Sequence, residues 1–199
     1  KTDSKSNYNK KIRQLINGSK PEEIYFDGDK EKEKCKSEYF GLGAVSVSPN
    51  DDLMGYSLDL KGSEYYTIYV RNLNNGNNLN DEISDTNGDV VWSLDSKSFF
   101  YTKLDKFHRP RQIFKHFVGT NKMEDQLIFE EKEETFTCSI SLSSDEKFFF
   151  ITSSDHITTE EYFFEANTKV INPKLFQKRE TDVRYSIDSW KDYFYVHTN

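Results

Sequence analysis

The chain is poor in the residues that build covalent or metal-held scaffolds. Its 199 residues contain two cysteines, Cys35 and Cys138, and no CxxC pair. We therefore expect no disulfide framework, no metal site and no cofactor. Two isolated cysteines suit a reducing compartment, so we expect a cytoplasmic protein. Nine glycines and four prolines exclude collagen-like and proline-rich chains.

Long apolar runs and a surplus of basic residues are also missing. No apolar run approaches the roughly 18 residues that span a membrane, and the first residues, 1–4 (KTDS), form no apolar signal segment. The chain has 27 Lys and Arg against 34 Asp and Glu, a net charge of -7. Because nucleic-acid binding relies on cationic side chains, we expect neither a nucleic-acid nor a membrane partner.

The sequence contains no G-x-S-x-G segment, no P-loop and no GxGxxG, and its four histidines have no HExxH spacing. Asp155 and His156 are adjacent, and neighbouring residues of a strand point to opposite faces. A loop histidine is therefore favoured over an acid–base pair. The acidic run 130–134 has no glycine-containing calcium loop and indicates a solvated turn. The residues alone indicate a binding or structural β-module without an active site.

Aromatic residues, in contrast, are abundant, with 12 Tyr and 16 Phe, and they accompany a repeat. The segment 48–56 (SPNDDLMGY) has counterparts at 93–101 (SLDSKSFFY) and 143–151 (SSDEKFFFI), followed by a degenerate fourth copy. The copies close on apolar residues 45, 50 and 45 positions apart: Tyr56, Tyr101, Ile151 and Val196. A period of about 40–50 residues with four strands per unit is typical of propeller blades.

Strand patterns cover most of the chain. Residues 44–48 alternate apolar and polar side chains, as a half-buried strand does. Residues 148–151 (FFFI) lose this alternation, which predicts a strand covered on both faces. Two leading strands at 11–16 and 22–27 flank a turn at 17–21. With three sets of four strands and a final pair, sixteen strands are expected.

No segment shows a convincing helical period, and the charged connector 29–37 fits a helix or a solvated loop. The predicted fold class is all-β: an incomplete β-propeller with about three four-stranded antiparallel blades and two half blades. We divide it into outer strands of a first blade with a connector, three blades, and the inner strands of a further blade: 1–42, 43–84, 85–131, 132–179 and 180–199.

Several stretches, in order along the chain, resemble the propeller of the oligopeptidase B group of serine peptidases, in the prolyl oligopeptidase family. They cover the chain from about residue 22 onward: 38–43 (EYFGLG), 47–50, 56–59, 62–64, 109–110, 116–120 (HFVGT), 125–132 (DQLIFEEK), 180–188 and 197–199. No single stretch is diagnostic. The resemblance rests on the presence of all these stretches in the same order.

The resemblance implies a seven-bladed propeller that caps an α/β-hydrolase domain and limits entry to short peptides, which are cleaved after basic residues. This chain is similar to part of that propeller only. We therefore assign no catalytic residue to it, and the resemblance implies catalysis by the parent protein. The implied partners are the hydrolase domain of the same parent protein and short basic peptides.

Loops that follow the second strand of each blade share one rim of a propeller, which we expect to face the hydrolase domain. The sequence therefore gives six candidates for interdomain or substrate-gate contacts, each of which also fits a plain loop residue: Glu64, His108, Arg109, Arg111, His156 and Glu160.

One other function fits the sequence. The chain fits a stand-alone propeller-like module that binds a protein partner, derived from a split or decayed peptidase gene. Catalysis by this chain alone would need a nucleophile and a base that the sequence does not offer. Unpaired strand edges recruit other chains, so we also expect a dimer or a higher assembly.

Overall fold

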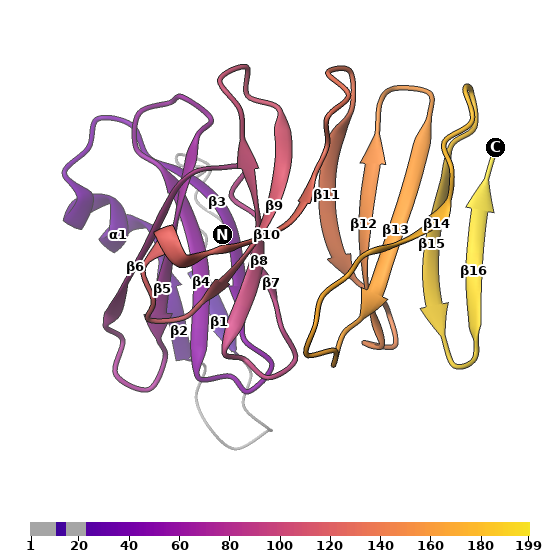
Figure 1. Ribbon diagram of the computed structural model, residues 1–199. Coiled ribbons are helices and arrows are strands. Elements are labelled where there is room, and N and C mark those ends of the chain that lie inside the picture. Colours follow the sequence, from indigo (N-terminus) through magenta and orange to yellow (C-terminus); the bar gives the residue numbers. More distant parts are fainter. Residues whose placement is uncertain (1–10, 15–22) are drawn as a thin grey trace, which may run out of the picture.

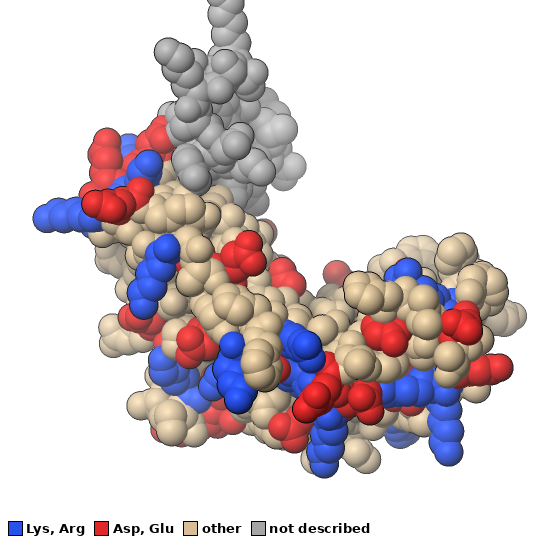
Figure 2. All heavy atoms as spheres, turned by 90° about the horizontal axis from the view of Figure 1, so that it is seen from above, with Lys and Arg blue, Asp and Glu red and all other residues tan. Residues whose placement is uncertain are grey.

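The structure, a computed structural model, describes residues 11–14 and 23–199, and most of this backbone is β-strand. The described ranges contain sixteen strands in antiparallel sheets that stand side by side (Figure 1). Seen from above, they follow an open arc (Figure 2). The predicted fold class is confirmed. The predicted turn at 17–21 lies outside the described residues, and the residue limits of the five units stay a prediction.

The first blade is built from four consecutive strands: β3 (Gly41–Val47), β4 (Leu53–Asp59), β5 (Tyr66–Asn72) and β6 (Asn78–Thr86). Each pairs with its neighbour in sequence, as expected when short turns join antiparallel strands. Register shifts interrupt the ladders of β3 with β4 and of β5 with β6. Such bulges add local twist to a sheet.

The second blade repeats this order with β7 (Val91–Trp92), β8 (Ser98–Leu104), β9 (Pro110–Phe117) and β10 (Gln126–Glu130). A single 3₁₀ turn, η1 (Lys122–Glu124), precedes β10. One residue pair between β6 and β8 links the hydrogen bonding of the first two blades into one eight-stranded sheet. The two blades otherwise meet through their side chains.

The third blade comprises β11 (Thr137–Leu142), β12 (Phe148–Ser154), β13 (Thr159–Glu165) and β14 (Lys174–Gln177). It forms a separate four-stranded antiparallel sheet. Its inner pair keeps one register over six residue pairs. The predicted grouping of four strands per blade therefore appears three times in succession.

Two strand pairs complete the described chain. β1 (Lys11–Gln14) pairs with β2 (Glu23–Asp27), and β15 (Tyr185–Trp190) pairs with β16 (Tyr193–Thr198). We call β15 and β16 the terminal pair. All six residues of β16 are exposed, and this strand has a partner on one side only among the described strands.

One helix, α1 (Gly28–Cys35), occupies the charged connector, for which a helix and a solvated loop were both predicted. Its first turn carries Asp29 and Glu31 and its last turn Lys32 and Lys34, an order that suits the helix dipole. Apolar periodicity is absent because only Gly28 and Glu31 are buried. Glu31 lies 3.0 Å from the guanidinium of Arg71 on β5, and this tertiary contact holds the short helix in place.

The sequence repeat corresponds to the turn between the first two strands of each blade. Ser48, Ser93 and Ser143 directly follow the first strands, and each hydroxyl donates to the Asn or Asp two residues later, at 2.8, 2.6 and 3.0 Å. The same hydroxyls accept the backbone N–H five residues on. These side chains close the turns as backbone groups would. The repeat is therefore a turn signature, and the degenerate fourth copy has a shorter turn at Lys191.

The seams between blades are apolar, and the second strand of each blade supplies both faces. Phe99 and Tyr101 of β8 pack against the first blade, whereas Phe100 packs with the third. On β12, Phe149 joins the second blade, and Phe148 contacts Phe194 of the terminal pair at 5.1 Å between ring centroids. Each such ring contributes roughly 2–3 kcal/mol by burial. The prediction that residues 148–151 are covered on both faces is confirmed.

A buried charged cluster crosses the seam between the first and second blades. His116 on β9 is 1% exposed, and its ring nitrogens lie 2.8 Å from Asp81 on β6 and 2.7 Å from Asp125. Both nitrogens face carboxylate oxygens, so both carry protons and the ring is an imidazolium. Burial opposes this charge, but the two carboxylates outweigh it and raise the pKa of His116 to about 9.

We expect His116→Gln to lower the free energy of unfolding by about 3 kcal/mol, because two carboxylates would remain buried without a cation. In the native chain, this stabilisation is complete below about pH 6.5 and is lost as the pH rises to about 9, because folding raises the pKa of His116. Urea unfolding from pH 6 to 10 measures both effects. His156→Gln, at an exposed histidine, is the control. Equal stability of the two variants would contradict this role.

Candidate functional site

The predicted site residues lie on or next to loops at one edge of the arc. The connections from β4 to β5, β8 to β9 and β12 to β13 are at the upper edge of Figure 1. The connections from β10 to β11 and from β14 to β15 reach the same edge. We call this edge the upper rim. Figure 2 looks down on it and shows Lys and Arg interspersed with Asp and Glu.

Glu64 and His108 flank a contact between the first two blades. The hydroxyl of Tyr65 donates to the carbonyl of Asp105 at 2.7 Å, and the rings of Tyr65 and His108 lie 4.1 Å apart. Glu64 is exposed and has a left-handed backbone, fixed by its N–H bond to the carboxylate of Asp59 at 2.8 Å. The aromatic contact, rather than the Glu64 side chain, joins the two loops.

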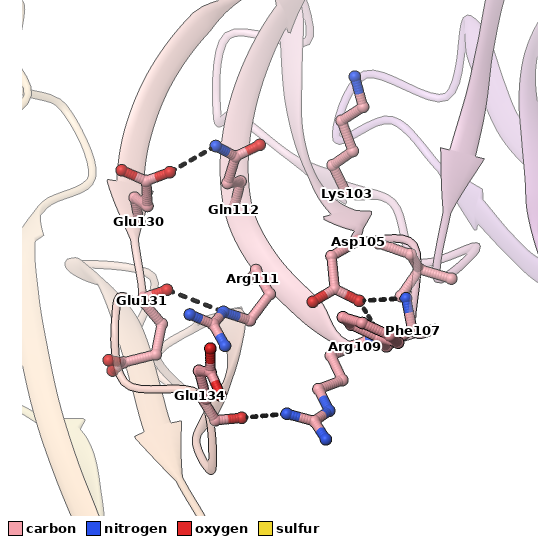
Figure 3. Close-up of a pocket in the computed structure, with 10 residues that line it drawn as sticks. Lys103, Asp105, Phe107, Arg109, Arg111, Gln112, Glu130, Glu131 and Glu134 are labelled. Carbon is pink, nitrogen blue, oxygen red and sulfur yellow. Dashed lines mark hydrogen bonds between the residues drawn. The ribbon is translucent and has the colours of Figure 1, made fainter.

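Arg109 and Arg111 line a cavity of about 460 Å³ beside the loop from β8 to β9 (Figure 3). Arg111 Nε donates to the carbonyl of Glu131 at 2.9 Å, and the guanidinium of Arg109 donates to the carbonyl of Glu134. Asp105 accepts the N–H groups of Phe107 and Arg109 at 2.7 and 3.0 Å, which orders the loop. The two arginines therefore tie the second blade to the connection that leads into the third.

Glu160 belongs to an ion cluster that the sequence did not reveal. Arg179, in the connection after β14, lies 2.7 Å from Glu160 and 3.0 Å from Glu131. Its guanidinium also covers the ring of Phe136 at 4.0 Å. Ser153 and the N–H of Glu133 donate to Glu131 as well. The cluster thus connects the second blade, the third blade and the chain that leads to the terminal pair.

The carboxylates of this cluster are ionised. Burial opposes the charge of Glu131, but the bonds from Ser153, the Glu133 N–H and Arg179 outweigh it and lower the pKa. Burial likewise opposes the charge of Glu160, and the bonds from the side chain and N–H of Arg179 and from Tyr162 lower its pKa. Arg179 was missed because nothing in residues 178–180 (KRE) distinguishes it from an ordinary charged loop.

His156 is exposed in the loop from β12 to β13, apart from the cavity and the ion cluster. Asp155 does not orient it, because one of its carboxylate oxygens accepts the N–H groups of Ile157 and Thr158 at 2.9 and 2.7 Å. Those backbone bonds are the main reason that the pKa of Asp155 is lowered. The structure therefore relates Arg109, Arg111 and Glu160 through the loop around Glu131, and His108 through Tyr65, but leaves His156 separate.

This rim has the chemistry of a binding surface. The buried His116 with its two carboxylates has no access to a substrate. In the described part of the chain, no group of three or more His, Cys, Asp or Glu side chains is arranged to hold a metal ion. Among the described residues, no helix is both long and apolar enough to cross a membrane. Charged side chains in fixed positions around a cavity can orient a polar partner or a peptide.

Comparison with known proteins identifies the class. The family model described as the prolyl oligopeptidase N-terminal beta-propeller domain matches residues 1–199. Protease 2 from Moraxella lacunata is 30% identical over 180 residues, which cover 89% of this chain and 26% of that protein. Dipeptidyl aminopeptidase BI from Pseudoxanthomonas mexicana is 30% identical over 166 residues, 81% of this chain and 22% of that protein.

Solved structures agree. Oligopeptidase B from Leishmania major superposes with a TM-score of 0.86 at 25% identity over 94% of this chain and 26% of that one. Oligopeptidase B from Trypanosoma brucei, in a closed form with covalently bound antipain, gives 0.83 at 27% identity over the same shares.

The chain belongs to the family of N-terminal β-propeller domains of prolyl oligopeptidases. The predicted resemblance to the propeller of oligopeptidase B is confirmed. The chain spans about a quarter of the length of the curated relatives named above.

We expect Arg179→Gln to lower the free energy of unfolding by about 3 kcal/mol at pH 7, because Glu131 and Glu160 would stay buried without their cation. Their lowered pKa values stabilise the fold above about pH 4.5, and this stabilisation is lost as the pH falls. The deficit of the variant should therefore shrink below about pH 4. Urea titrations at pH 7 and pH 3.5 measure it, with Arg184→Gln, at an exposed rim arginine, as the control. A deficit that does not change with pH would contradict the ionic role.

Proposed function

We propose that this chain is the substrate-gating propeller of an oligopeptidase B-like serine endopeptidase that cleaves short peptides after basic residues. The match of the family model to residues 1–199 carries the proposal. The superposition on oligopeptidase B supports it, and so does the absence of a nucleophile motif from this sequence. In this proposal the chemistry belongs to a hydrolase domain of the same parent protein.

The upper rim is the side that we assign to that domain and to the entering peptide. Glu64, His108 and Arg109 are exposed there, and Arg109 lines the cavity. Arg109 and Arg111 are held by backbone carbonyls, so their guanidinium groups are already oriented for a partner. In this proposal Glu160 holds Arg179 in position at the rim. His156 is assigned a contact with the partner from the neighbouring loop between β12 and β13. A cytoplasmic setting is supported by the free cysteines Cys35 and Cys138.

The gate is tested in the parent polypeptide. The nucleotide sequence beyond the codon for Asn199 should encode further blades and a G-x-S-x-G segment. In that polypeptide, we expect the double substitution Arg109→Ala and Arg111→Ala to lower kcat/KM for short peptides about tenfold, by weakening closure over the substrate. Lys97→Ala, at an exposed lysine between β7 and β8, is the control.

Unchanged peptide kinetics and unchanged domain closure in the double variant would show that Arg109 and Arg111 do not form the gate. A reading frame without any hydrolase domain would favour the stand-alone interaction module instead. We would recognise such a module as a monodisperse chain that lacks peptidase activity and retains a protein partner.

We also propose that copies of the 199-residue chain, when it is separated from any following blade, associate through the exposed strand β16. Tyr193, Tyr195 and Val196 are 70%, 56% and 51% exposed on it, and unpaired strand edges recruit further strands. We expect light scattering at high concentration to detect a dimer or a larger assembly. Val196→Lys should shift the population toward the monomer, because charge on an edge strand opposes pairing. A native chain that is monomeric throughout would contradict the proposal.

A further inference from the structure

Two consecutive glutamates on β13 face opposite sides of the third blade. Glu160 points toward the second blade, where Arg179 neutralises it. Glu161 is paired in register with Thr152 and lies on the face that meets the terminal pair. We call this packing of β12 and β13 against β15 and β16 the terminal seam. Its two sides are neighbours at the right of Figure 1.

Glu161 is buried without a cation. It is 2% exposed, and the Thr152 hydroxyl lies 3.1 and 3.0 Å from its two carboxyl oxygens. Among the described residues, no Lys, Arg or His nitrogen forms an ion pair with it. One hydroxyl cannot replace the hydration of a carboxylate, so the neutral acid is the form that the closed seam accepts. Burial raises the pKa of Glu161 to about 8, although the Thr152 bond opposes this.

The contacts that close the seam surround this carboxyl. The backbone N–H of Glu161 donates to the Tyr185 hydroxyl at 3.0 Å, and that hydroxyl donates to the carbonyl of Gln177 at 2.8 Å. Farther along the seam, the ring of Phe194 packs among four phenylalanines at centroid distances of 5.1 to 6.0 Å: Phe148, Phe150, Phe163 and Phe176.

The neighbouring elements present few charges to Glu161. β12 contributes Thr152, β14 the amide of Gln177, and β15 the phenol of Tyr185, whose pKa is raised by burial and by both adjacent glutamates. The remaining charged or titratable groups nearby are engaged elsewhere or exposed: Glu160 and Arg179 bind each other, Asp188 binds Ser144, and Arg184 and His197 are exposed.

We propose that Glu161 is a proton-controlled latch, which closes the terminal seam while its carboxyl is protonated and loosens the seam when the carboxyl ionises. Ionisation places a charge with no cationic partner among buried groups, and the nearest relief is separation of the terminal pair from β13. That movement opens a lateral slot between the third blade and β15. The latch belongs to the seam itself, so it holds whether or not the parent protein is a peptidase.

The direction of the pH effect follows from linkage. The pKa is raised in the closed seam and returns toward its ordinary value of 4.5 when the seam opens. Seam stability is therefore complete below about pH 4.5 and falls as the pH rises to about 8, where the loss levels off. The opening constant should rise about ninefold from pH 6 to pH 7 and about fivefold from pH 7 to pH 8.

Amide hydrogen exchange of the intact 199-residue chain tests the latch. After correction for intrinsic exchange, protection of β15 and β16 should fall about 50-fold from pH 6 to pH 8. Protection of β4 and β5, which depends on His116 rather than on Glu161, should have the same pH dependence in the native chain and in Glu161→Gln. In Glu161→Gln, which keeps every histidine, protection of the terminal pair should become independent of pH. Glu165→Gln, at an exposed residue of the same strand, should retain the native pH dependence.

Glu161→Met provides a second non-ionisable side chain of similar length if the glutamine variant fails to fold, as judged by near-ultraviolet circular dichroism. A pH-independent terminal pair in the native chain would overturn the proposal. It would also be overturned if either non-ionisable variant kept the native pH dependence of the terminal pair, or if the substitution changed the pH dependence of all blades equally.

Discussion

The structure depends on side-chain packing between sheets that share almost no backbone hydrogen bonds. A four-stranded blade satisfies its own ladder but leaves both faces apolar, so it is stable only between neighbours. The second strand of each blade meets this constraint by placing aromatic rings on both faces. Phe99 and Phe100, adjacent in sequence, belong to different seams. The same arrangement explains why alternation disappears in residues 148–151.

The polar groups near these seams follow a second constraint, because a buried charge needs a partner of opposite sign. His116 lies between two aspartates, and Arg179 lies between two glutamates. Glu161 has only a hydroxyl partner and is therefore neutral in the closed seam. The upper rim includes the Arg179 cluster, so groups that position the rim also hold the blades together.

Local patterns in the sequence predicted the strands and their grouping, because strand alternation and Ser–Asx turns are encoded over a few residues. The ion clusters were not predictable in this way. Asp81 and His116 are 35 positions apart, and Glu131 and Arg179 are 48 apart, so their contacts require the stacking of whole blades. Glu160 was selected for its loop position, and its partner became visible only in three dimensions. The sequence left helix α1 undecided between a helix and a loop, because the helix buries an ion pair rather than an apolar stripe.

Ser48, Ser93 and Ser143 make the blades alike at their turns, yet the two seams between the three blades and the terminal seam differ in chemistry. An imidazolium with two carboxylates crosses the first seam, a guanidinium with two carboxylates crosses the second, and a neutral acid lies in the terminal one. Identical seams would weaken together under any change of conditions. Here acid weakens the seam between the second and third blades. Alkali weakens the seam between the first and second blades and the terminal seam, so different conditions weaken different seams. A partial separation of the blades therefore begins at a particular seam, and the pH selects that seam.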